Sequence, residues 1–397
     1  MRIAVIGGAG RVGLPLAVVL ADVGHDVIAI DSNQERVQSI REGKSPFSEP
    51  GLDELLQSVR QRQRLSIQEE NSFVEGCDLV FVVVGTDLND DDTPQNESVL
   101  EAIRGIRKHL SSSSAVVLRS TVTPETTAHV AELLDGVIAD VAFCPERIAE
   151  GHALEELRAM PQLVGTRTGE VPKCINDVFS SLQVEVISMT WKEAELSKLL
   201  LNTWRYAQFA IANEFANVCE SHDVSYSSLR TFLLYRYPRG LGLMAPGFAG
   251  GPCLRKDTIQ LLKSTSLQSE LLEAVLHSHD SLTSRVVELV CGVVGDSDKK
   301  VVQLGITFKP ESDDLRGSVA LELAHQLNRR LKNFFVVDPH VSPLPEFNFL
   351  SANEVAETAD LVVVATRHPE FTGLSVRAPV IDAAGPRLLN KIRISDS

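Results

Sequence analysis

The chain has few cysteines for its length, and none of them stands where a metal or redox motif would place it. Its 397 residues include six cysteines but no C-x-x-C pair. No cysteine has a histidine at a metal-ligand spacing, so we expect no bound metal. Six scattered cysteines are typical of reduced thiols in a cytoplasmic enzyme, and we expect that location.

Positive charge and long apolar runs are also lacking. Lys and Arg number 38 against 53 Asp and Glu, a formal net charge of −15. This balance argues against nucleic acid or an anionic membrane surface as the main partner. No apolar run approaches about 18 residues, so we expect no membrane-spanning helix. The first residues form a strand pattern without the charged leader of a signal peptide.

Short runs of Val, Ile and Leu are present early in the chain and again near its end. Such continuous runs are typical of parallel strands that are buried on both faces. Helical stretches separate them, which is the doubly wound α/β pattern. Strands are predicted at 3–6, 27–30, 79–84, 115–118 and 137–143, and again at 301–304, 334–337, 361–365 and 380–381.

A long helical pattern, residues 191–222, separates the two α/β regions. Thr190 and Glu193 have the spacing of a capping box at its start. The predicted fold class is therefore α/β, with two Rossmann-like doubly wound domains joined by a central helical domain that has a long spine helix. We place a first Rossmann-like domain at 1–188, the central domain at 189–294 and a second Rossmann-like domain at 295–397.

A dinucleotide-binding motif follows the first predicted strand and opens a helix. In the sequence GAGRVG, Gly8 permits the tight turn, Gly10 lets a pyrophosphate approach the backbone, and Gly13 allows close packing of helix on strand. Asp31 ends the next predicted strand. A carboxylate there accepts hydrogen bonds from both ribose hydroxyls and repels a 2′-phosphate, so NAD is favoured over NADP.

Cys253 lies in the sequence GGPCLRKD, residues 250–257. The two glycines let the backbone approach a ligand closely. Lys256 supplies a cation that favours a nucleophilic thiolate, and Asp257 supplies a proton acceptor. Together with a nicotinamide, a thiolate can trap an aldehyde as a thiohemiacetal, carry it to a thioester and release an acid. The alternative is that Cys253 is a small buried hydrophobe.

Two further pairs of polar residues are candidates. Lys198 and Asn202 are spaced i, i+4 and so share one helix face, where together they can stabilise an oxyanion. Glu146 and Glu150 follow a predicted strand, at the sheet edge where ligands of open α/β folds lie. The alternative for both pairs is an ordinary solvated surface.

A charged loop follows the first strand of the second α/β region. It contains Lys309 and Arg316, which are suited to phosphates in a protein this acidic. That region has no G-x-G-x-x-G, so it binds a different nucleotide or none. An ordinary charged loop is the alternative.

Taken in order, these motifs resemble those of the nucleotide-sugar 6-dehydrogenase family, which includes UDP-glucose, UDP-N-acetylmannosamine and GDP-mannose dehydrogenases. The resemblance implies NAD-dependent, four-electron oxidation of the C6 hydroxymethyl of a nucleotide sugar, and a homodimer built on the long central helix. The stretches that match are Gly8–Ala17, Glu49–Leu55, Ser120–Val122, Pro145–Gly151, Ala194–Asn202, Asn213–Glu214, Gly250–Asp257, Gly305–Arg316 and Asp338–Pro339.

The resemblance also implies roles for individual residues. Cys253 matches the nucleophile, Lys198 and Asn202 match the oxyanion-stabilising pair, and Arg239 resembles an arginine that reaches a partner subunit's sugar site. The other expected catalytic residues are Asp257 and Thr121, which act with an ordered water, and Glu150, which acts in thioester hydrolysis. Cofactor contacts are expected at Gly8, Gly10, Arg11, Val12, Gly13, Asp31, Thr86, Thr121, Lys256 and Arg316, and substrate contacts at Glu146, Lys198, Asn202, Arg239, Gly250 and Lys309.

Some positions depart from the family pattern, and other functions stay open. Arg119 stands where the family often has Lys, and residues 84–87 read VGTD where it often has VPTP. A sugar epimerase would need a Tyr-x-x-x-Lys pair, which no tyrosine here provides. A 3-hydroxyacid or phosphogluconate-type dehydrogenase would stop after two electrons without needing Cys253. A non-catalytic nucleotide-sugar-binding protein is the remaining alternative, and the sugar and the base stay open.

Overall fold

The computed structural model describes residues 1–397 apart from 90, 139, 296, 384–387 and 390–397. The chain divides into two compact units, Met1–Leu201 with Ile259–Ser266, and Asn202–Thr258 with Leu267–Ser397. The division falls inside two helices, α8 (Trp191–Glu220) and α10 (Leu254–Lys263). Within the described ranges, no helix is both long enough and apolar enough to cross a membrane.

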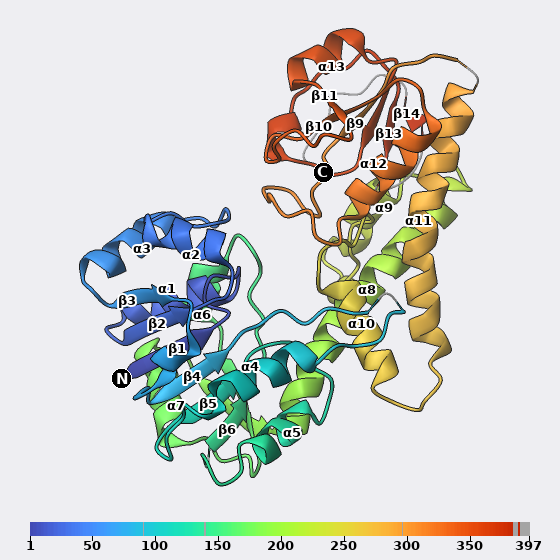
Figure 1. The fold of residues 1–397 in the computed structure, drawn as a ribbon. Coiled ribbons are helices and arrows are strands. Elements are labelled where there is room, and N and C mark those ends of the chain that lie inside the picture. The colour runs from blue at the N-terminus through green and yellow to red at the C-terminus, as the bar shows by residue number, and fades with distance from the viewer. Residues whose placement is uncertain (90, 139, 296, 384–387, 390–397) are drawn as a thin grey trace. The chain divides into compact units, whose positions relative to one another are not determined.

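The first unit is built on an eight-stranded sheet of the order β3-β2-β1-β4-β5-β6-β7-β8 (Figure 1). Neighbouring strands are parallel except β6 and β7. Successive chain crossovers run in opposite directions from β1, which makes the β1–β4 edge a topological switch point, where such sheets bind ligands. The strands are β1 (Arg2–Ile6), β2 (Asp26–Ile30), β3 (Leu65–Gln68), β4 (Leu79–Val82), β5 (Ala115–Leu118), β6 (Asp140–Phe143), β7 (Gln162–Thr166) and β8 (Val186–Thr190).

Helices cover both faces of this sheet, so its central strands are buried on two sides. Along β1, Ile3 and Val5 enter one core cluster while Ala4 and Ile6 enter the other. This alternation is why the strand reads as a continuous apolar run. The connecting helices are α1 (Gly13–Asp22), α2 (Gln34–Arg41), α3 (Leu52–Gln61), η1 (Asn71–Val74), α4 (Glu97–Arg107), α5 (Thr126–Leu133), α6 (Ala153–Ala159) and α7 (Lys173–Ser181).

Three strands of this sheet were not predicted from the sequence. β3 and β8 are edge strands with exposed positions, so polar residues interrupt their apolar ones. β7 is fully buried, yet Gln162, Gly165 and Thr166 interrupt its apolar residues. The predicted strand 137–143 begins at Asp140, and position 139 lies outside the described residues.

Helix α8 begins at the predicted capping box and ends two residues before the predicted limit, His222. The Thr190 N–H and hydroxyl both donate to Glu193 Oε2 at 2.7 Å. One turn later, Glu195 is 1% exposed and accepts from the N–H and the hydroxyl of Thr127 at the start of α5. These contacts fix the first two turns of α8 on the first unit.

The second unit holds a six-stranded sheet of the order β11-β10-β9-β12-β13-β14, parallel except for β13 with β14 (Figure 1). All four predicted strands of this region are present. The strands are β9 (Val301–Leu304), β10 (Phe334–Val337), β11 (Asn348–Phe349), β12 (Leu361–Val364), β13 (Val380–Asp382) and β14 (Leu388–Leu389). The helices are α9 (Tyr226–Leu234), η2 (Pro238–Gly240), α11 (Glu270–Val294), α12 (Val319–Arg330), α13 (Ala352–Thr358) and η3 (Pro369–Phe371).

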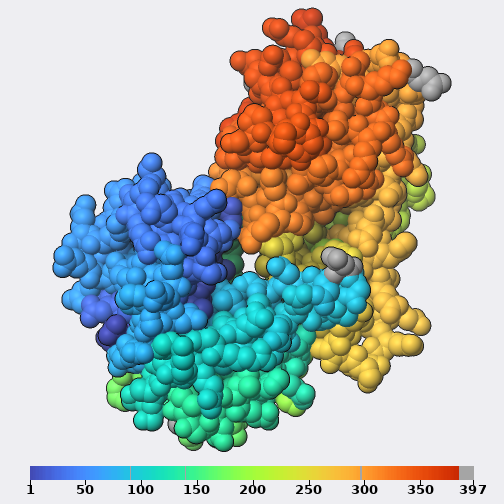
Figure 2. Space-filling view, viewed as in Figure 1, coloured from blue at the N-terminus to red at the C-terminus, as the bar shows by residue number. Residues whose placement is uncertain are grey.

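The acidic segment 87–97 of the first unit lies at the surface, in the cyan part of Figure 2. Asp87, Asp91 and Glu97 are exposed. Asn89 and Thr93 close the loop through backbone and side-chain hydrogen bonds. The acidic segment therefore forms a surface loop, apart from residue 90, which lies outside the described residues.

Candidate active site

The dinucleotide motif forms a loop between β1 and α1. Gly7, which precedes the motif and which the sequence analysis overlooked, has φ +80°, a conformation that favours glycine. A Cβ on Gly8 would come within 2.7 Å of the Val5 carbonyl oxygen, and one on Gly13 would overlap the Gly7 carbonyl. Helix α1 has neither a side-chain cap nor an acidic residue in its first turn. Its first backbone N–H groups are therefore suited to bind a phosphate.

Asp31 lies beside this loop, immediately after β2. Its Oδ2 accepts from the Ala9 N–H at 3.0 Å, and its Oδ1 accepts from the Asn33 N–H at 3.0 Å. The carboxylate is thus fixed against the backbone of the glycine loop. This is the position from which a carboxylate reaches the ribose of a bound dinucleotide.

The ends of β4 and β5 bring two predicted site residues together. The Thr86 hydroxyl donates to the Thr121 backbone oxygen at 2.6 Å, and Thr86 is only 3% exposed. Both follow strands that flank the switch point, since β4 pairs with β1 and with β5. Thr121 is therefore held at the carboxyl edge of the sheet.

Arg11 and Glu150 form an ion pair that joins the glycine loop to the segment after β6. Arg11 Nη1 lies 2.5 Å from Glu150 Oε1. The guanidinium also lies over the Phe47 ring, 5.2 Å from its centroid. The sequence analysis assigned Arg11 to the cofactor and Glu150 to hydrolysis, and did not foresee their contact. A cofactor phosphate that attracted Arg11 would weaken the ion pair and so change the electrostatic environment of Glu150.

Glu146 has its carboxylate in a buried ion pair with Arg119. The Arg119 Nε and Nη2 both donate to Glu146 Oε2, and the arginine side chain has no exposed surface. The other oxygen, Oε1, accepts from the Arg147 and Ile148 N–H groups at 2.8 and 3.0 Å. Burial alone would raise the pKa of Glu146, but the charge and hydrogen bonds of Arg119 hold that pKa below its usual value. The carboxylate therefore stays ionised and fully engaged.

The backbone of Glu146 contacts the predicted catalytic lysine. Lys198 Nζ donates to the Glu146 carbonyl oxygen, which places the amine beside the segment that follows β6. Arg119 also donates from Nη1 to Gln162 Oε1 at 3.2 Å and contacts Cys144 Sγ at 3.1 Å. Arg119 thus fixes the turn that anchors Lys198.

Asn202 follows Lys198 by one turn of α8 and contacts the helix that begins after Cys253. Its Nδ2 donates to Asp257 Oδ2 at 2.5 Å. Both side chains are buried, Asn202 at 8% and Asp257 at 0% exposure. The amide therefore fixes the carboxylate that sequence analysis placed in proton transfer.

Cys253 lies immediately before α10 and is half-buried. Its carbonyl oxygen accepts from the Asp257 N–H at 2.8 Å, which continues the helix geometry back to the cysteine. A thiolate at this position faces the positive end of the helix dipole. The placement suits a nucleophile better than an inert core thiol such as Cys144, whose pKa burial raises to about 11.

The glycines before Cys253 pack against the loop that follows β9. Gly251 has φ +98°, and a Cβ there would come within 2.7 Å of the Phe308 ring. Its N–H donates to the Gly317 carbonyl at 2.9 Å. Lys309 Nζ lies 5.6 Å from the centroid of the Phe308 ring. The loop that contains Lys309 thus packs directly against the loop that contains Cys253.

Two predicted arginines have contacts that differ from their expected roles. Arg316 Nη2 pairs with the buried carboxylate of Asp314 at 2.6 Å, although the Arg316 side chain is 59% exposed. Arg239 lies in η2, is exposed, and stacks over Tyr237 at 5.6 Å. Neither contact involves another predicted site residue, so their roles toward cofactor and partner subunit stay predictions.

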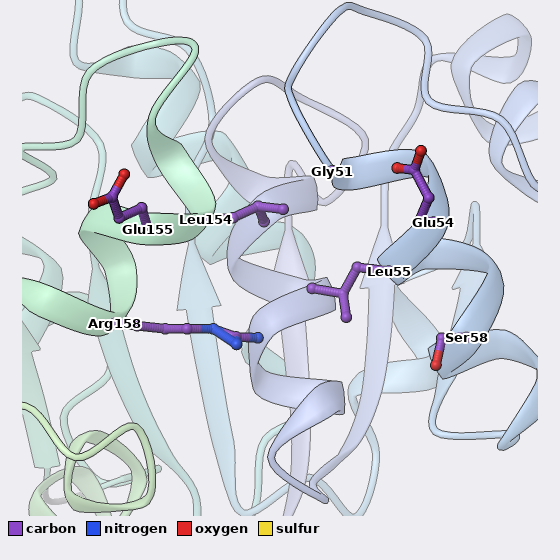
Figure 3. A pocket seen from close by; sticks show the side chains of 7 residues that line it. All are labelled: Gly51, Glu54, Leu55, Ser58, Leu154, Glu155 and Arg158. Carbon is purple, nitrogen blue, oxygen red and sulfur yellow. The ribbon is translucent and has the colours of Figure 1, made fainter.

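A separate surface groove of about 480 Å³ lies between α3 and α6 of the first unit (Figure 3). Leu55 and Leu154 point toward one another across it, and Arg158 extends along its floor (Figure 3). Arg158 pairs with Asp22 at 2.8 Å. No predicted catalytic residue lines this groove, so it is not part of the candidate site.

The UDP-glucose/GDP-mannose dehydrogenase family matches in its NAD binding domain at residues 1–183, its central domain at 192–280 and its UDP binding domain at 302–385. The UDP-N-acetyl-D-mannosamine dehydrogenase of Pyrococcus horikoshii is 29% identical, covering 94% of this chain and 91% of that protein. The GDP-mannose 6-dehydrogenase of Pseudomonas savastanoi pv. phaseolicola is 30% identical, covering 97% and 96%. A solved UDP-glucose dehydrogenase from Pyrobaculum islandicum superposes with a TM-score of 0.88 at 28% identity, covering 96% and 94%.

Replacing Arg119 by methionine should destabilise the first unit, because the substitution leaves Glu146 charged and buried without its partner. Removing one member of a buried pair costs about 3–5 kcal/mol. The urea midpoint of unfolding measures the loss. The matched control is Arg41→Met, which breaks an exposed pair with Glu69 and should cost about 1 kcal/mol or less. Equal midpoints for the two variants would contradict the assignment.

Proposed function

Because the chain belongs to the UDP-glucose/GDP-mannose dehydrogenase family, we propose that it oxidises C6 of a nucleotide sugar from alcohol to carboxylate through a thioester on Cys253. The observation that supports this most directly is the position of Cys253. It precedes α10 one turn before Asp257, which Asn202 binds at 2.5 Å. A two-electron dehydrogenase has no use for a nucleophile at this position.

The first unit is suited to the NAD of this family. The glycine loop lacks side chains where a pyrophosphate approaches, and the uncapped start of α1 supplies N–H donors. Asp31 would accept from the ribose hydroxyls. When bound, NAD+ accepts one hydride from the substrate in each of two oxidations. Every other step falls to the side chains of the protein.

The first oxidation needs a proton acceptor for the C6 hydroxyl. We assign this to a water bound by Thr121 with Asp257 or Lys198. The buried Asp257 is oriented for it by Asn202. Cys253 Sγ then attacks the resulting aldehyde carbon. The carbonyl π electrons move to oxygen, giving a thiohemiacetal whose oxygen Lys198 and Asn202 stabilise.

The second oxidation gives a thioester on Cys253, and hydrolysis releases the product. Water adds to the thioester carbon, and the thiolate leaves with the sulfur's bonding pair. Glu150, which is 17% exposed and paired with Arg11, is the carboxylate we assign to help that water. Retaining the carbon skeleton on sulfur between the two oxidations explains why one site can perform both.

We propose that the substrate is a UDP-hexose or UDP-N-acetylhexosamine. The second unit contains the segment matched as a UDP binding domain, and its loop after β9 contains Lys309. Substrate contacts are proposed for Glu146 through its backbone, and for Lys198, Asn202, Gly250 and Lys309. Arg316 and Lys256 are proposed to contact the cofactor.

We further propose that the protein forms a homodimer through α8. One face of this helix exposes a row of apolar side chains at helical spacing: Leu200 54%, Trp204 59%, Ile211 44%, Phe215 45% and Val218 58%. Exposed apolar rows of this size are typical of interfaces. Arg239 would then reach the partner's substrate site. The reduced thiol that the reaction requires favours a cytoplasmic location.

Replacing Cys253 by serine should lower the steady-state rate of acid formation by roughly 10³-fold or more, because a serine hydroxyl has no general base prepared for it. The measurement is NADH release at saturating substrate together with chromatography of the sugar product. A matched control is Cys291→Ser, at a half-buried free thiol in α11. A Cys253→Ser enzyme with full turnover to the acid would exclude the covalent route.

The wild-type enzyme should release two NADH per molecule of acid. UDP-glucose, UDP-galactose, UDP-N-acetylhexosamines and GDP-mannose are compared at equal concentration, with NADP+ as a second cofactor arm. We expect one UDP sugar to give the highest kcat/KM, and NAD+ to be preferred because of Asp31. One NADH per product would instead support the two-electron alternative. Tight binding of a UDP sugar without NADH would indicate a non-catalytic protein.

Replacing Val218 by arginine should dissociate the dimer, because it puts a charge into the apolar row on α8. Light scattering after size-exclusion chromatography should give the mass of one chain for this variant and of two chains for the wild type. Glu357→Arg, at an exposed position of α13, is the control and should leave the dimer intact. A wild-type protein with the mass of one chain at micromolar concentration would disprove the assembly.

A further inference from the structure

Three metal-binding side chains meet in the second unit at the carboxyl edge of its sheet. His340 follows β10, and His368 and Glu370 follow β12. One potential ligand atom from each lies within 4.8 Å of those of the other two. Since β10 and β12 both pair with β9, their carboxyl ends face the same side. No metal-ligand spacing is visible in the sequence here, because the two histidines are far apart in the chain.

The contact between His340 and Glu370 has the separation of two ligands on one ion. Their Nε2 and Oε1 atoms are 3.1 Å apart. Yet the buried Nε2 makes no hydrogen bond with any described residue, so the two atoms are close without being aligned as donor and acceptor. Two ligands held at about 2.0–2.2 Å on a tetrahedral zinc ion lie roughly 3.3 Å apart, each directed at the metal. A shared cation accounts for both features of the contact.

His368 has the hydrogen bonds of an oriented metal ligand. Its Nδ1 accepts from the Glu311 N–H at 3.2 Å, so the proton is on Nε2. Nε2 lies 3.2 Å from Asp338 Oδ2 and 3.1 Å from Thr307 Oγ1. A buried carboxylate on one imidazole nitrogen leaves the lone pair on the other and fixes the ring, as in carboxylate–histidine–zinc groups. Glu311 is exposed, so water can replace the acceptor of its N–H when a metal takes Nδ1.

Asp338 is itself held in place by backbone N–H groups. Its Oδ2 accepts from the Ile306 N–H at 2.8 Å, and its Oδ1 accepts from the His340 N–H at 2.9 Å. The His340 and His368 rings are adjacent, with centroids 4.8 Å apart. His340 and Glu370 have side chains 29% and 48% exposed, which gives an ion access from solvent.

We propose that His340, His368 and Glu370 bind a divalent transition-metal ion of the zinc type, with water as the fourth ligand. Two imidazoles and one carboxylate suit Zn²⁺, Co²⁺ or Ni²⁺, whereas Mg²⁺ and Ca²⁺ prefer oxygen ligands. The ion would join the chain after β10 to the chain after β12, and so stabilise the second unit.

The experiment measures Zn²⁺ binding to the full-length protein, freed of metal with EDTA and without a polyhistidine tag. Isothermal titration should show about one equivalent bound, and the melting temperature should rise with Zn²⁺ but not with Mg²⁺. His340→Ala and Glu370→Gln should each weaken Zn²⁺ binding by roughly 10–100-fold. Both residues are partly exposed, so these variants should fold, whereas the buried His368 has three partners and is left unchanged. All proteins also carry Cys253→Ser, so that this thiolate cannot bind the metal.

The matched controls are His222→Ala and Glu357→Gln, at exposed positions outside the cluster. They should bind Zn²⁺ like the parent. Absence of binding in the parent, or equal binding by His340→Ala and its control, would overturn the proposal. Co²⁺ substitution gives a second readout, because a tetrahedral site produces intense visible absorption that His340→Ala should abolish. NADH formation by the protein with Cys253 is assayed separately, so a failed metal site leaves the proposed function intact.

Discussion

The candidate chemistry depends on one turn of helix α8. Lys198 and Asn202 are four residues apart on it, a rise of about 6 Å along the axis. Lys198 Nζ is held by the Glu146 carbonyl, and Asn202 is held by Asp257. The capping box at Thr190 and the buried Glu195 fix the start of the same helix. Each of the two side chains is therefore oriented by a contact within its own unit, and an oxyanion site requires donors that are oriented in advance.

The position of Lys198 depends on the buried ion pair between Arg119 and Glu146. A carboxylate that is paired with arginine and accepts two backbone N–H groups has no capacity left to act as a base, and its pKa lies below the usual range. Glu146 therefore contributes through its backbone oxygen. Glu150, four residues on, remains within reach of solvent and is paired with Arg11. Burial and the ion pair with Arg119 thus give Glu146 a structural role, whereas the partly exposed Glu150 is the carboxylate for which a reactive role is proposed.

Much of this could be predicted from the sequence, and the failures have physical causes. Parallel strands such as β1 and β9 are buried on both faces and so appear as continuous apolar runs, whereas the exposed β8 does not. The capping box could be predicted because its two residues lie close together in the sequence. The pairing of Arg119 with Glu146 was not, because it joins two strand ends through the folded sheet. In the sequence, Arg119 is notable only because it stands where the family often has Lys.

The cluster around Cys253 and the cluster of His340, His368 and Glu370 also differ in this way, since one is local in sequence and the other is not. Cys253 and Asp257 are four residues apart in the sequence, so the helix period alone relates them. Gly251 could be recognised beside them as a site of close approach. Its φ of +98° and the Phe308 ring against it show why another residue would not fit. His340 and His368 are related only by the parallel order of β10, β9 and β12. Since the carboxyl ends of parallel strands converge, such a sheet gathers polar groups that no local pattern connects. Sequence patterns cannot reveal a ligand site of this kind. The folded structure reveals it, through atoms that lie close together without the alignment of a hydrogen bond.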